Sequence, residues 1–398
     1  MLQARRRLLM GLSALALPFP NLALAAAATD RRFVFVVLRG ALDGIGAVVP
    51  YADPDYRALR GEIALAEPGQ EGGALDLDGR FGLHPALAPL ERFWQERQLA
   101  LVHAVATPYR QRSHFDGQDL LENGTADPRA SGGGWLNRTI GLLGKPVEPN
   151  RRIGLAVGQT VPLTLRGAIP VASWAPPQLP DASSDFLAKV SALYRDDRTL
   201  GPALTQGIGA HEMSSQVIGN QAMNGAPARG SGAFKASAEA AGKLLASPKG
   251  PRIAVLELTG FDTHAQQRGR IVGPLAAFAE GMAALADALG PAWADTAVLA
   301  ASEFGRTATV NGTLGTDHGT AGVAFVLGGR IAGGRILGNW PGLAADKLYE
   351  GRDLAPTTDL RAVAKALLRD SLGVPEDALA KVVFPESRTV RPLNGLVA

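Results

Sequence analysis

The sequence predicts an α/β fold, with a mostly parallel central sheet flanked by helices on both faces. The run at 33–38 is apolar without interruption, which is typical of a strand buried on both sides, and the run at 253–258, interrupted only by Glu257, predicts another strong strand. Helical patterns alternate with runs of this kind along the chain. This alternation is the order that brings parallel strands into one sheet.

The remaining elements follow from the same patterns. Further strands are expected at 99–105, 153–157, 296–300 and 323–327, and helices at 86–98, 185–195, 234–245, 271–289 and 360–372. The helix at 271–289 carries an apolar face of Leu275, Phe278, Met282 and Leu285. Residues 160–230 are rich in Pro, Gly, Ala and Ser, which predicts a cap or insertion. We therefore expect a single α/β domain over 29–398.

The N-terminus has the pattern of a signal peptide, which we place at residues 1–28. Arg5, Arg6 and Arg7 precede a short apolar run at 8–17, and the small residues at 23–25 suit a peptidase. Paired arginines directly before the apolar run favour the twin-arginine export machinery, with an ordinary secretion signal as the alternative. The run is too short for a membrane span, and no later stretch is expected to be long enough. The sequence thus predicts a periplasmic or secreted protein without a stable membrane anchor.

Charge and cysteine content exclude several classes of function. The chain carries a net charge of +3, and residues 1–28 contribute three arginines and no acid, so the rest sums to 3 − 3 = 0. No basic stripe with interleaved aromatic residues is present, which argues against nucleic-acid binding. The chain has no cysteine, so any metal must be held by oxygen and imidazole ligands.

Acids and histidines recur beside the ends of the predicted strands. They are Asp43 after the first strand, Asp262 and His264 after the strand at 253–258, Glu303 after 296–300, and Asp317 and His318 just before 323–327. Ligands of such sheets bind beyond the carboxyl ends of the strands. His103 lies inside a strand and is expected to be a hydrogen-bonded core residue.

Crowded carboxylates raise one another's pKa values unless cations compensate them. A divalent metal is therefore expected. Histidine favours Zn²⁺ or Mn²⁺, and Mg²⁺ or Ca²⁺ fits less well. Two such ions would clamp both the attacking and the leaving oxygen of a phosphoryl-type displacement, so one or two ions are expected.

Ser113 precedes a predicted helix and has two compatible interpretations. It can be an N-cap, with Asp116 three residues on as in a capping box. It can also be a nucleophile held at a helix N-terminus, where backbone N–H groups favour an anion. Arg110 and Arg112 would add positive charge there.

Five motifs give the chain a resemblance to a known family. They are Leu38-Arg39-Gly40-Ala41-Leu42-Asp43-Gly44, Arg112-Ser113-His114-Phe115-Asp116, Gly260-Phe261-Asp262-Thr263-His264, Ser302-Glu303-Phe304-Gly305-Arg306-Thr307 and Gly315-Thr316-Asp317-His318-Gly319. With the twin-arginine start, they resemble the DUF1501 family of exported bacterial proteins. That family is grouped with the alkaline phosphatase-like superfamily, which includes phosphatases, sulfatases and phosphodiesterases.

The resemblance implies a metal-dependent hydrolase of phosphate or sulfate esters, with a small anionic ester or a glycan as its ligand. It implies Ser113 as the nucleophile. The implied metal ligands are Asp43, Asp262, His264, Glu303, Asp317 and His318. The implied substrate-binding residues are Arg112, His114, Asp116 and Arg306.

One position departs from the superfamily pattern. Phe304 follows Glu303 where the superfamily has a histidine, so one metal site could lack a ligand unless Asp317 supplies it. Two alternatives therefore stay open: a degenerate, non-catalytic binding or accessory protein, and a metal-free serine esterase. The esterase would use Ser113 and His318, with Asp317 or Asp262 orienting the histidine.

Overall fold

The structure is a computed structural model, and it describes most of the chain. The described residues are 23–24, 30–130, 132–144, 151–176, 182–202, 204–205, 207–208, 217–218 and 231–398. The signal peptide predicted at 1–28 lies outside them, apart from residues 23–24. Much of the predicted cap at 160–230 lies outside them as well.

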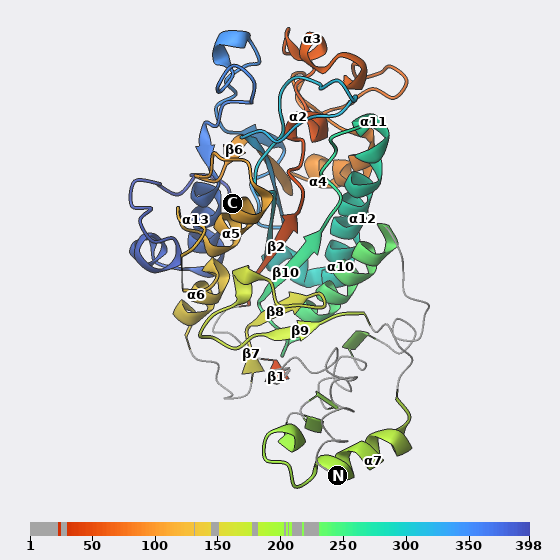
Figure 1. The fold of residues 1–398 in the computed structure, drawn as a ribbon, viewed down its shortest axis with the longest axis vertical. Helices are drawn as coiled ribbons and strands as arrows, with labels where there is room; N and C mark the ends of the chain where they lie inside the picture. Colours follow the sequence, from red (N-terminus) through yellow and green to blue (C-terminus); the bar gives the residue numbers. More distant parts are fainter. Residues whose placement is uncertain are drawn as a thin grey trace.

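A nine-stranded mixed sheet forms the centre of the described fold (Figure 1). Its order is β13-β6-β12-β11-β2-β10-β8-β9, and β14 pairs with β6. The strands are β2 (Arg32–Leu38), β6 (Leu99–Ala106), β8 (Gly154–Val157), β9 (Ala172–Trp174), β10 (Ile253–Leu258), β11 (Thr296–Ala301), β12 (Gly322–Leu327), β13 (Arg335–Leu337) and β14 (Thr358–Asp359). The six predicted strands are all present, each within about two residues of its expected bounds.

Strand β12 runs against the direction of both of its neighbours, while the other pairings in this sheet are parallel. Its first residue, Gly322, therefore lies at the edge where β2, β6, β10 and β11 end. The loop that precedes β12 consequently meets the loops that follow the other four strands. The mostly parallel sheet is thus confirmed, and its antiparallel strand has a direct consequence for the site.

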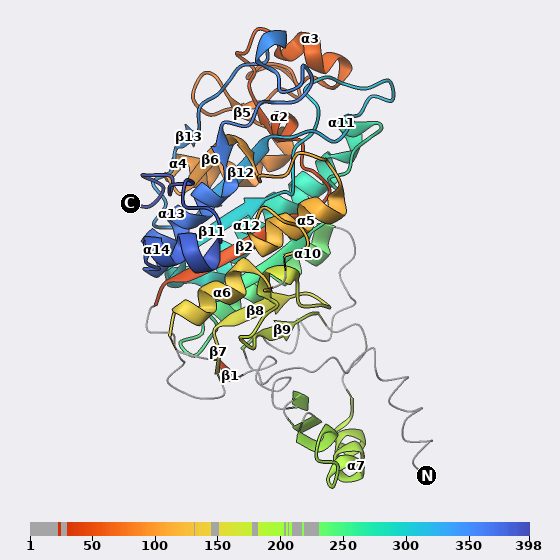
Figure 2. The ribbon, with the colours of Figure 1, turned by 60° about the vertical axis from the view of Figure 1, so that its left-hand side comes forward.

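Helices cover both faces of the sheet (Figures 1 and 2). Alternate side chains of β2 point to opposite faces, as the period of a strand requires. One set, Val34, Val36 and Leu38, packs in a cluster with α10 (Ser231–Ala246) and α12 (Val272–Leu289). The other set, Phe33, Phe35 and Val37, packs with α6 (Trp135–Leu142) and α13 (Leu360–Leu372). All seven residues of β2 are buried, which explains why the six that follow Arg32 are apolar without interruption.

The remaining described elements are short. The helices are α2 (Gly44–Ala47), α3 (Tyr56–Arg60), α4 (Glu91–Gln95), α5 (His114–Asn123), α7 (Ser184–Tyr194), α11 (Gln267–Arg270) and α14 (Glu376–Ala378). The 3-10 and π segments are η1 (Gly61–Ile63), η2 (Pro85–Leu90), η3 (Leu163–Leu165), η4 (Gly290–Asp295), η5 (Ala345–Lys347) and η6 (Leu379–Val383). The minor strands are β1 (Ala23–Leu24), β3 (Val48–Val49), β4 (Leu75–Asp76), β5 (Gly82–Leu83) and β7 (Arg151–Arg152).

Two expectations need correction. The single helix predicted at 86–98 is a 3-10 helix, η2, followed by the short α4. Pro89 lies inside η2 and cannot donate a backbone hydrogen bond, which disfavours an α-helix there.

The second correction concerns membrane spans. The run Gln267–Asp295 is long and apolar enough to cross a membrane by length and composition alone, with a mean hydropathy of 1.3. A core helix gives the same signal, and the predicted apolar face of α12 is buried against the sheet.

Candidate metal centre

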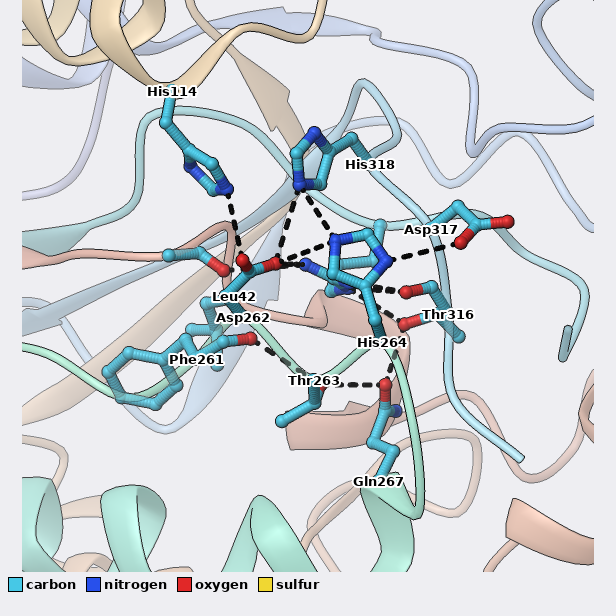
Figure 3. Close-up of polar contacts among 12 residues, drawn as sticks. Leu42, His114, Phe261, Asp262, Thr263, His264, Gln267, Thr316, Asp317 and His318 are labelled. Carbon is cyan, nitrogen blue, oxygen red and sulfur yellow. Dashed lines mark hydrogen bonds and ion pairs between the residues drawn. The ribbon is translucent and has the colours of Figure 1, made fainter. Parts of the chain in front are cut away.

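Four side chains converge at the edge of the sheet where β2, β6, β10 and β11 end (Figure 3). Asp262 lies among His114, His264 and His318. Its Oδ1 is 3.0 Å from Nε2 of His264 and 3.3 Å from Nε2 of His318, and its Oδ2 is 3.6 Å from Nε2 of His114. Candidate ligand atoms of His114, Asp262 and His318 all lie within 4.8 Å of one another. The Nε2 atoms of three imidazoles thus lie around one carboxylate.

The topology explains why residues so far apart in sequence meet. His114 is the first residue of α5, beyond the end of β6. Asp262 and His264 follow β10, and His318 precedes the antiparallel β12. The acids and histidines predicted to cluster beside strand ends come from these loops.

Glycines let two of these loops approach closely. A Cβ atom on Gly315 would lie 2.2 Å from the carbonyl oxygen of His264. A Cβ atom on Gly319 would lie 2.3 Å from the carbonyl carbon of Arg306. Real Cβ atoms do not approach backbone this closely, so glycine is required at both positions. The glycines that flank Asp317 and His318 therefore bring the two histidines of this region together.

Each of the three histidines has its other ring nitrogen held by an acceptor. Nδ1 of His114 is 2.7 Å from Oε1 of Glu303, and Nδ1 of His264 is 3.2 Å from Oδ1 of Asp317. Nδ1 of His318 is 2.9 Å from the carbonyl oxygen of Arg112. An acceptor at Nδ1 favours a proton on that nitrogen, so that in the neutral ring Nε2 carries the lone pair. This arrangement is typical of metal-binding histidines, whose outer partners set the ring orientation and raise its basicity.

The residues fit a divalent cation. Nε2 of His114 is buried and has no hydrogen-bond partner among the residues that the structure describes. A buried polar nitrogen without a partner is costly, and a metal ion would satisfy it. Imidazole and carboxylate together, without thiolate, suit Zn²⁺ or Mn²⁺. The side chain of Asp262 is 45% exposed, so the cluster opens to solvent.

Glu303 is fully buried behind His114. Its Oε1 accepts hydrogen bonds from the backbone N–H of Gly40 (2.9 Å) and from Nε2 of Gln118 (3.1 Å), and its Oε2 accepts one from Oγ of Ser302 (2.9 Å). Burial acts to raise the pKa of Glu303, but the hydrogen bonds, with that from His114 the largest, lower it overall. The same contact raises the pKa of His114, against the effect of burial. Glu303 is therefore an ionised partner of His114.

Arg306 neutralises part of the charge on Asp262. Its guanidinium is buried, and Nη1 donates to Oδ1 of Asp262 at 2.8 Å. Burial acts to raise the pKa of Asp262, but the hydrogen bond from Arg306 and the charges of Arg306, His264 and His114 together lower it overall. The pKa of Asp317 is lowered too, chiefly by a hydrogen bond from Asn311. Burial is the main cause of the lowered pKa of His318.

Asp43 makes its contacts with groups other than the three histidines. Its buried carboxylate forms an ion pair with the buried guanidinium of Arg60, and Oδ2 accepts a hydrogen bond from Nε2 of Gln267 at 2.5 Å. Oε1 of Gln267 in turn accepts from the hydroxyls of Thr263 and Thr316, at 2.8 and 2.6 Å. Through Gln267, Asp43 thus supports the two loops that carry His264 and His318.

Phe304 occupies the position where the superfamily pattern has a histidine. Its ring stacks on His114 with centroids 5.1 Å apart and lies 5.3 Å from the ring of His318. It is 4% exposed. The phenyl ring thus packs against two candidate ligands and fixes their orientation.

Ser113 takes the N-cap position of α5, but the predicted capping box is not formed among the residues that the structure describes. The hydroxyl of Tyr109 instead bridges Ser113 and Asp116, the two residues of the predicted box. That hydroxyl accepts from the backbone N–H of Ser113 at 3.2 Å and donates to Oδ2 of Asp116 at 3.3 Å. The side chain of Ser113 is therefore left without the capping role that the sequence allowed.

The sequence predicted most of the residues of this cluster. The structure shows which contacts each of them makes. His114 was expected to bind substrate, yet its Nε2 faces Asp262, whereas Glu303 and Asp317 contact histidines from behind. In the sequence, His114 lies beyond the end of a predicted strand, as Asp262 does, and this position could have identified it as a candidate ligand. Arg60 and Gln267, which hold Asp43, had no signal in the sequence.

The chain matches a known protein family and is similar to several solved structures. The family described as protein of unknown function (DUF1501) matches residues 94–383, which is most of the chain. No curated protein matches the sequence. Similar solved structures include Ps i-CgsB in complex with k-i-k-neocarrahexaose, at 11% identity over 77% of this chain and 68% of that one, with a TM-score of 0.41.

Two further similar structures come from bacteria. One is the C-terminal periplasmic domain of EcEptC from Escherichia coli, in complex with Zn, at 10% identity over 79% of this chain and 77% of that one (TM-score 0.35). The other is the alkaline phosphatase of the Antarctic bacterium TAB5, at 11% identity over 75% of this chain and 91% of that one (TM-score 0.36). A likeness at this level does not extend to function, which has to be argued from the site.

Proposed function

The chain belongs to the DUF1501 family, whose description assigns no activity, and from the geometry of its site we propose that it is an exported metal-dependent hydrolase of phosphate or sulfate esters. One divalent ion, Zn²⁺ or Mn²⁺, would be held by His114, Asp262, His264 and His318. The observation that carries this proposal is the convergence of three Nε2 atoms on one carboxylate, each with its Nδ1 bonded to an acceptor.

A single ion fits the surroundings better than two. The first aspartate of the superfamily pattern, Asp43, is neutralised by Arg60 in a buried ion pair. Phe304 supplies an apolar ring where a second site would need a ligand. Glu303 and Asp317, which were expected to ligate, act in this proposal by orienting His114 and His264.

A divalent ion bound at such a site polarises an ester oxygen and lowers the pKa of a bound hydroxyl or water. The chain's own groups would bind and orient the substrate. The N-terminus of α5 carries free backbone N–H groups and the positive end of the helix dipole, which favour an anionic group. Ser113 lies at that end, half-buried, and its hydroxyl is our candidate nucleophile. The ligand would be a small anionic ester or a glycan that carries one.

We place this activity in the periplasm or outside the cell. The reason is the arginine-rich signal pattern of residues 1–28, which favours the twin-arginine export machinery. A centre of this kind could be loaded before export, because that route carries folded proteins.

A non-catalytic metal-binding role is the second candidate. The observation in its favour is Phe304, which removes one side chain that the superfamily uses for metal binding. The two candidates share the metal and differ in turnover, so one experiment separates them.

The test is elemental analysis of the folded, exported protein, followed by assays of a panel of phosphate and sulfate esters before and after chelation. We expect about one equivalent of metal per chain, and hydrolysis that chelation abolishes and the same metal restores. The matched control is His103→Gln, which alters a buried histidine remote from the cluster and should keep the metal. Full activity after exhaustive chelation would favour the serine esterase, and a metal-loaded protein inert to the whole panel would favour the binding role.

A further inference from the structure

Asp353 is a buried carboxylate outside the cluster, and nothing in the sequence drew attention to it. It lies between η5 and β14 and is 0% exposed. Its Oδ2 is 2.9 Å from Nε and 2.8 Å from Nη2 of Arg112, and it accepts a hydrogen bond from Oγ1 of Thr320 at 2.8 Å. Its Oδ1 lies 3.1 Å from Nε of Arg352. This carboxylate thus binds two distant segments of the chain through Oδ2, while Oδ1 makes no hydrogen bond within the part of the chain that the structure describes.

Arg112 and Arg352 each make a hydrogen bond to His318 as well. The carbonyl of Arg112 accepts the hydrogen bond of His318 Nδ1, at 2.9 Å. Nη2 of Arg352 donates to the backbone carbonyl of His318 at 2.5 Å. Thr320 lies two residues beyond His318 in the same loop. Asp353 therefore acts on both the ring and the backbone of this histidine without touching its ring.

The acceptor at His318 differs in kind from those at the other two histidines. His114 and His264 are held by carboxylates of side chains, whereas His318 is held by a backbone carbonyl. The direction of that carbonyl depends on the backbone of Arg112, which has a left-handed φ of 61°. This conformation costs a non-glycine residue energy and persists only where its surroundings impose it. Glu350 and Asp353 both bind the guanidinium of Arg112, and Asp353, whose Oδ2 accepts from Nε and Nη2, is the buried one of the two and thus the better placed to impose it.

We propose that Asp353 is a positioning residue for His318, acting through the main-chain carbonyl of Arg112. It holds Arg112 in the left-handed conformation, the carbonyl keeps the proton of His318 on Nδ1, and Nε2 is left free to face Asp262. The consequence for metal binding rests on the proposed function, but the consequence for the tautomer does not.

The experiment measures both consequences on separate samples. The variants are Asp353→Asn, which removes the charge, and Arg112→Gly, which keeps the main-chain carbonyl but removes the guanidinium through which Asp353 holds the backbone in its left-handed conformation. Histidine ¹⁵N spectra of the chelated protein at pH 8 report which ring nitrogen carries the proton, and the chain has six histidines to assign. Titration with Mn²⁺ or Zn²⁺ gives the dissociation constant.

The matched control is Lys365→Met. Lys365 is a buried charge remote from the cluster, and its Nζ donates to the carbonyls of Ser387 and Val390 at 2.6 and 2.8 Å. Its loss should lower stability without changing His318. This control separates a general loss of stability from a specific loss of positioning.

We expect both test variants to move His318 from the Nδ1–H form toward the Nε2–H form, and to weaken metal binding about 10-fold or more. The double variant should be no worse than the single ones, because both remove the same contact. Variants that lower stability but keep the wild-type tautomer and dissociation constant would overturn the proposal and leave Asp353 with a structural role. If the wild type binds neither metal, the proposed function fails, while the spectra still decide the role of Asp353.

Discussion

Nε2 of His264 and Nε2 of His318 lie 3.0 Å apart. Both rings donate from Nδ1, to Asp317 and to the carbonyl of Arg112, so in the neutral rings each Nε2 presents a lone pair to the other. Two lone pairs at this distance repel unless a proton or a cation lies between them. A neighbouring carboxylate, Asp262, favours a cation at the same point. The predictions below follow from this relationship.

Replacing His318 by alanine should lower metal content and metal-dependent stability together. A metal that binds the folded state alone stabilises it by about 2.7 kcal/mol at 100 times its dissociation constant. Chelator should therefore lower the melting temperature of the wild type and barely change that of His318→Ala. Calorimetry with and without chelator measures this difference. An equal effect of chelator on both proteins would show that His318 is not a ligand.

Glu303→Gln should weaken metal binding by about 10- to 100-fold, because it removes the negative charge that orients His114. The control is Glu257→Gln. Glu257 also has a carboxylate with a charged partner, but that partner is Arg39 rather than a histidine. Titration with Zn²⁺ or Mn²⁺ gives both constants. Equal constants for wild type and Glu303→Gln would remove Glu303 from the metal centre.

Asp43→Asn should destabilise the protein without removing the metal. The change leaves the buried guanidinium of Arg60 without its counter-charge, and breaking a buried pair on one side costs about 3–5 kcal/mol. Urea denaturation measures the loss, and elemental analysis of the folded fraction measures the metal. Loss of metal at unchanged stability would instead support the ligand role that the sequence suggested for Asp43.

The sequence predicted the site better than it predicted the roles within it. Periodicity predicted the strands. The rule that ligands bind beyond strand ends then identified Asp262, His264 and His318 as candidate site residues. The contacts of Asp43 depend on Arg60, whose position after a short helix no local pattern reveals. The same holds for Asp353, because buried ion pairs between distant loops leave no periodic trace in the sequence.

The direction of β12 is a second feature that the sequence does not reveal. A run of apolar residues predicts a strand but not its orientation. A sequence therefore cannot say whether the loop before the strand or the loop after it reaches the site. Here the antiparallel direction of β12 brings His318, which precedes it, to the edge where other strands end.

Stability should fall as the pH is lowered from about 6.5 to about 4, in part because of two buried histidines. Burial lowers the pKa values of His84 and His103 to about 4, from an ordinary value of 6.5. Above pH 6.5 both are neutral whether the chain is folded or unfolded. Below it the unfolded chain binds protons that the folded chain excludes. Each group can thus cost up to about 3 kcal/mol by pH 4.

His103→Gln tests this dependence. The predicted core histidine is buried, and its Nε2 donates to the carbonyl of Val48 at 2.9 Å, a bond that a glutamine amide can replace. The free energy of unfolding of the chelated protein, measured in urea across this pH range, should fall less steeply in the variant. Parallel pH profiles for the two proteins would contradict the assignment of this loss to His103.

Ser113→Ala should abolish turnover while leaving both metal content and stability almost unchanged. If Ser113 is the nucleophile, the substitution removes the attacking oxygen and hydrolysis should stop. The four candidate metal ligands stay intact. A capping serine would add a loss of about 1 kcal/mol. The hydroxyl of Ser113 makes no cap hydrogen bond among the described residues, so we expect a change within about 0.5 kcal/mol. The measurements are ester hydrolysis, elemental analysis and urea denaturation on one preparation. A variant that keeps both its metal and its turnover would exclude Ser113 from the mechanism and favour a water molecule as the attacking group.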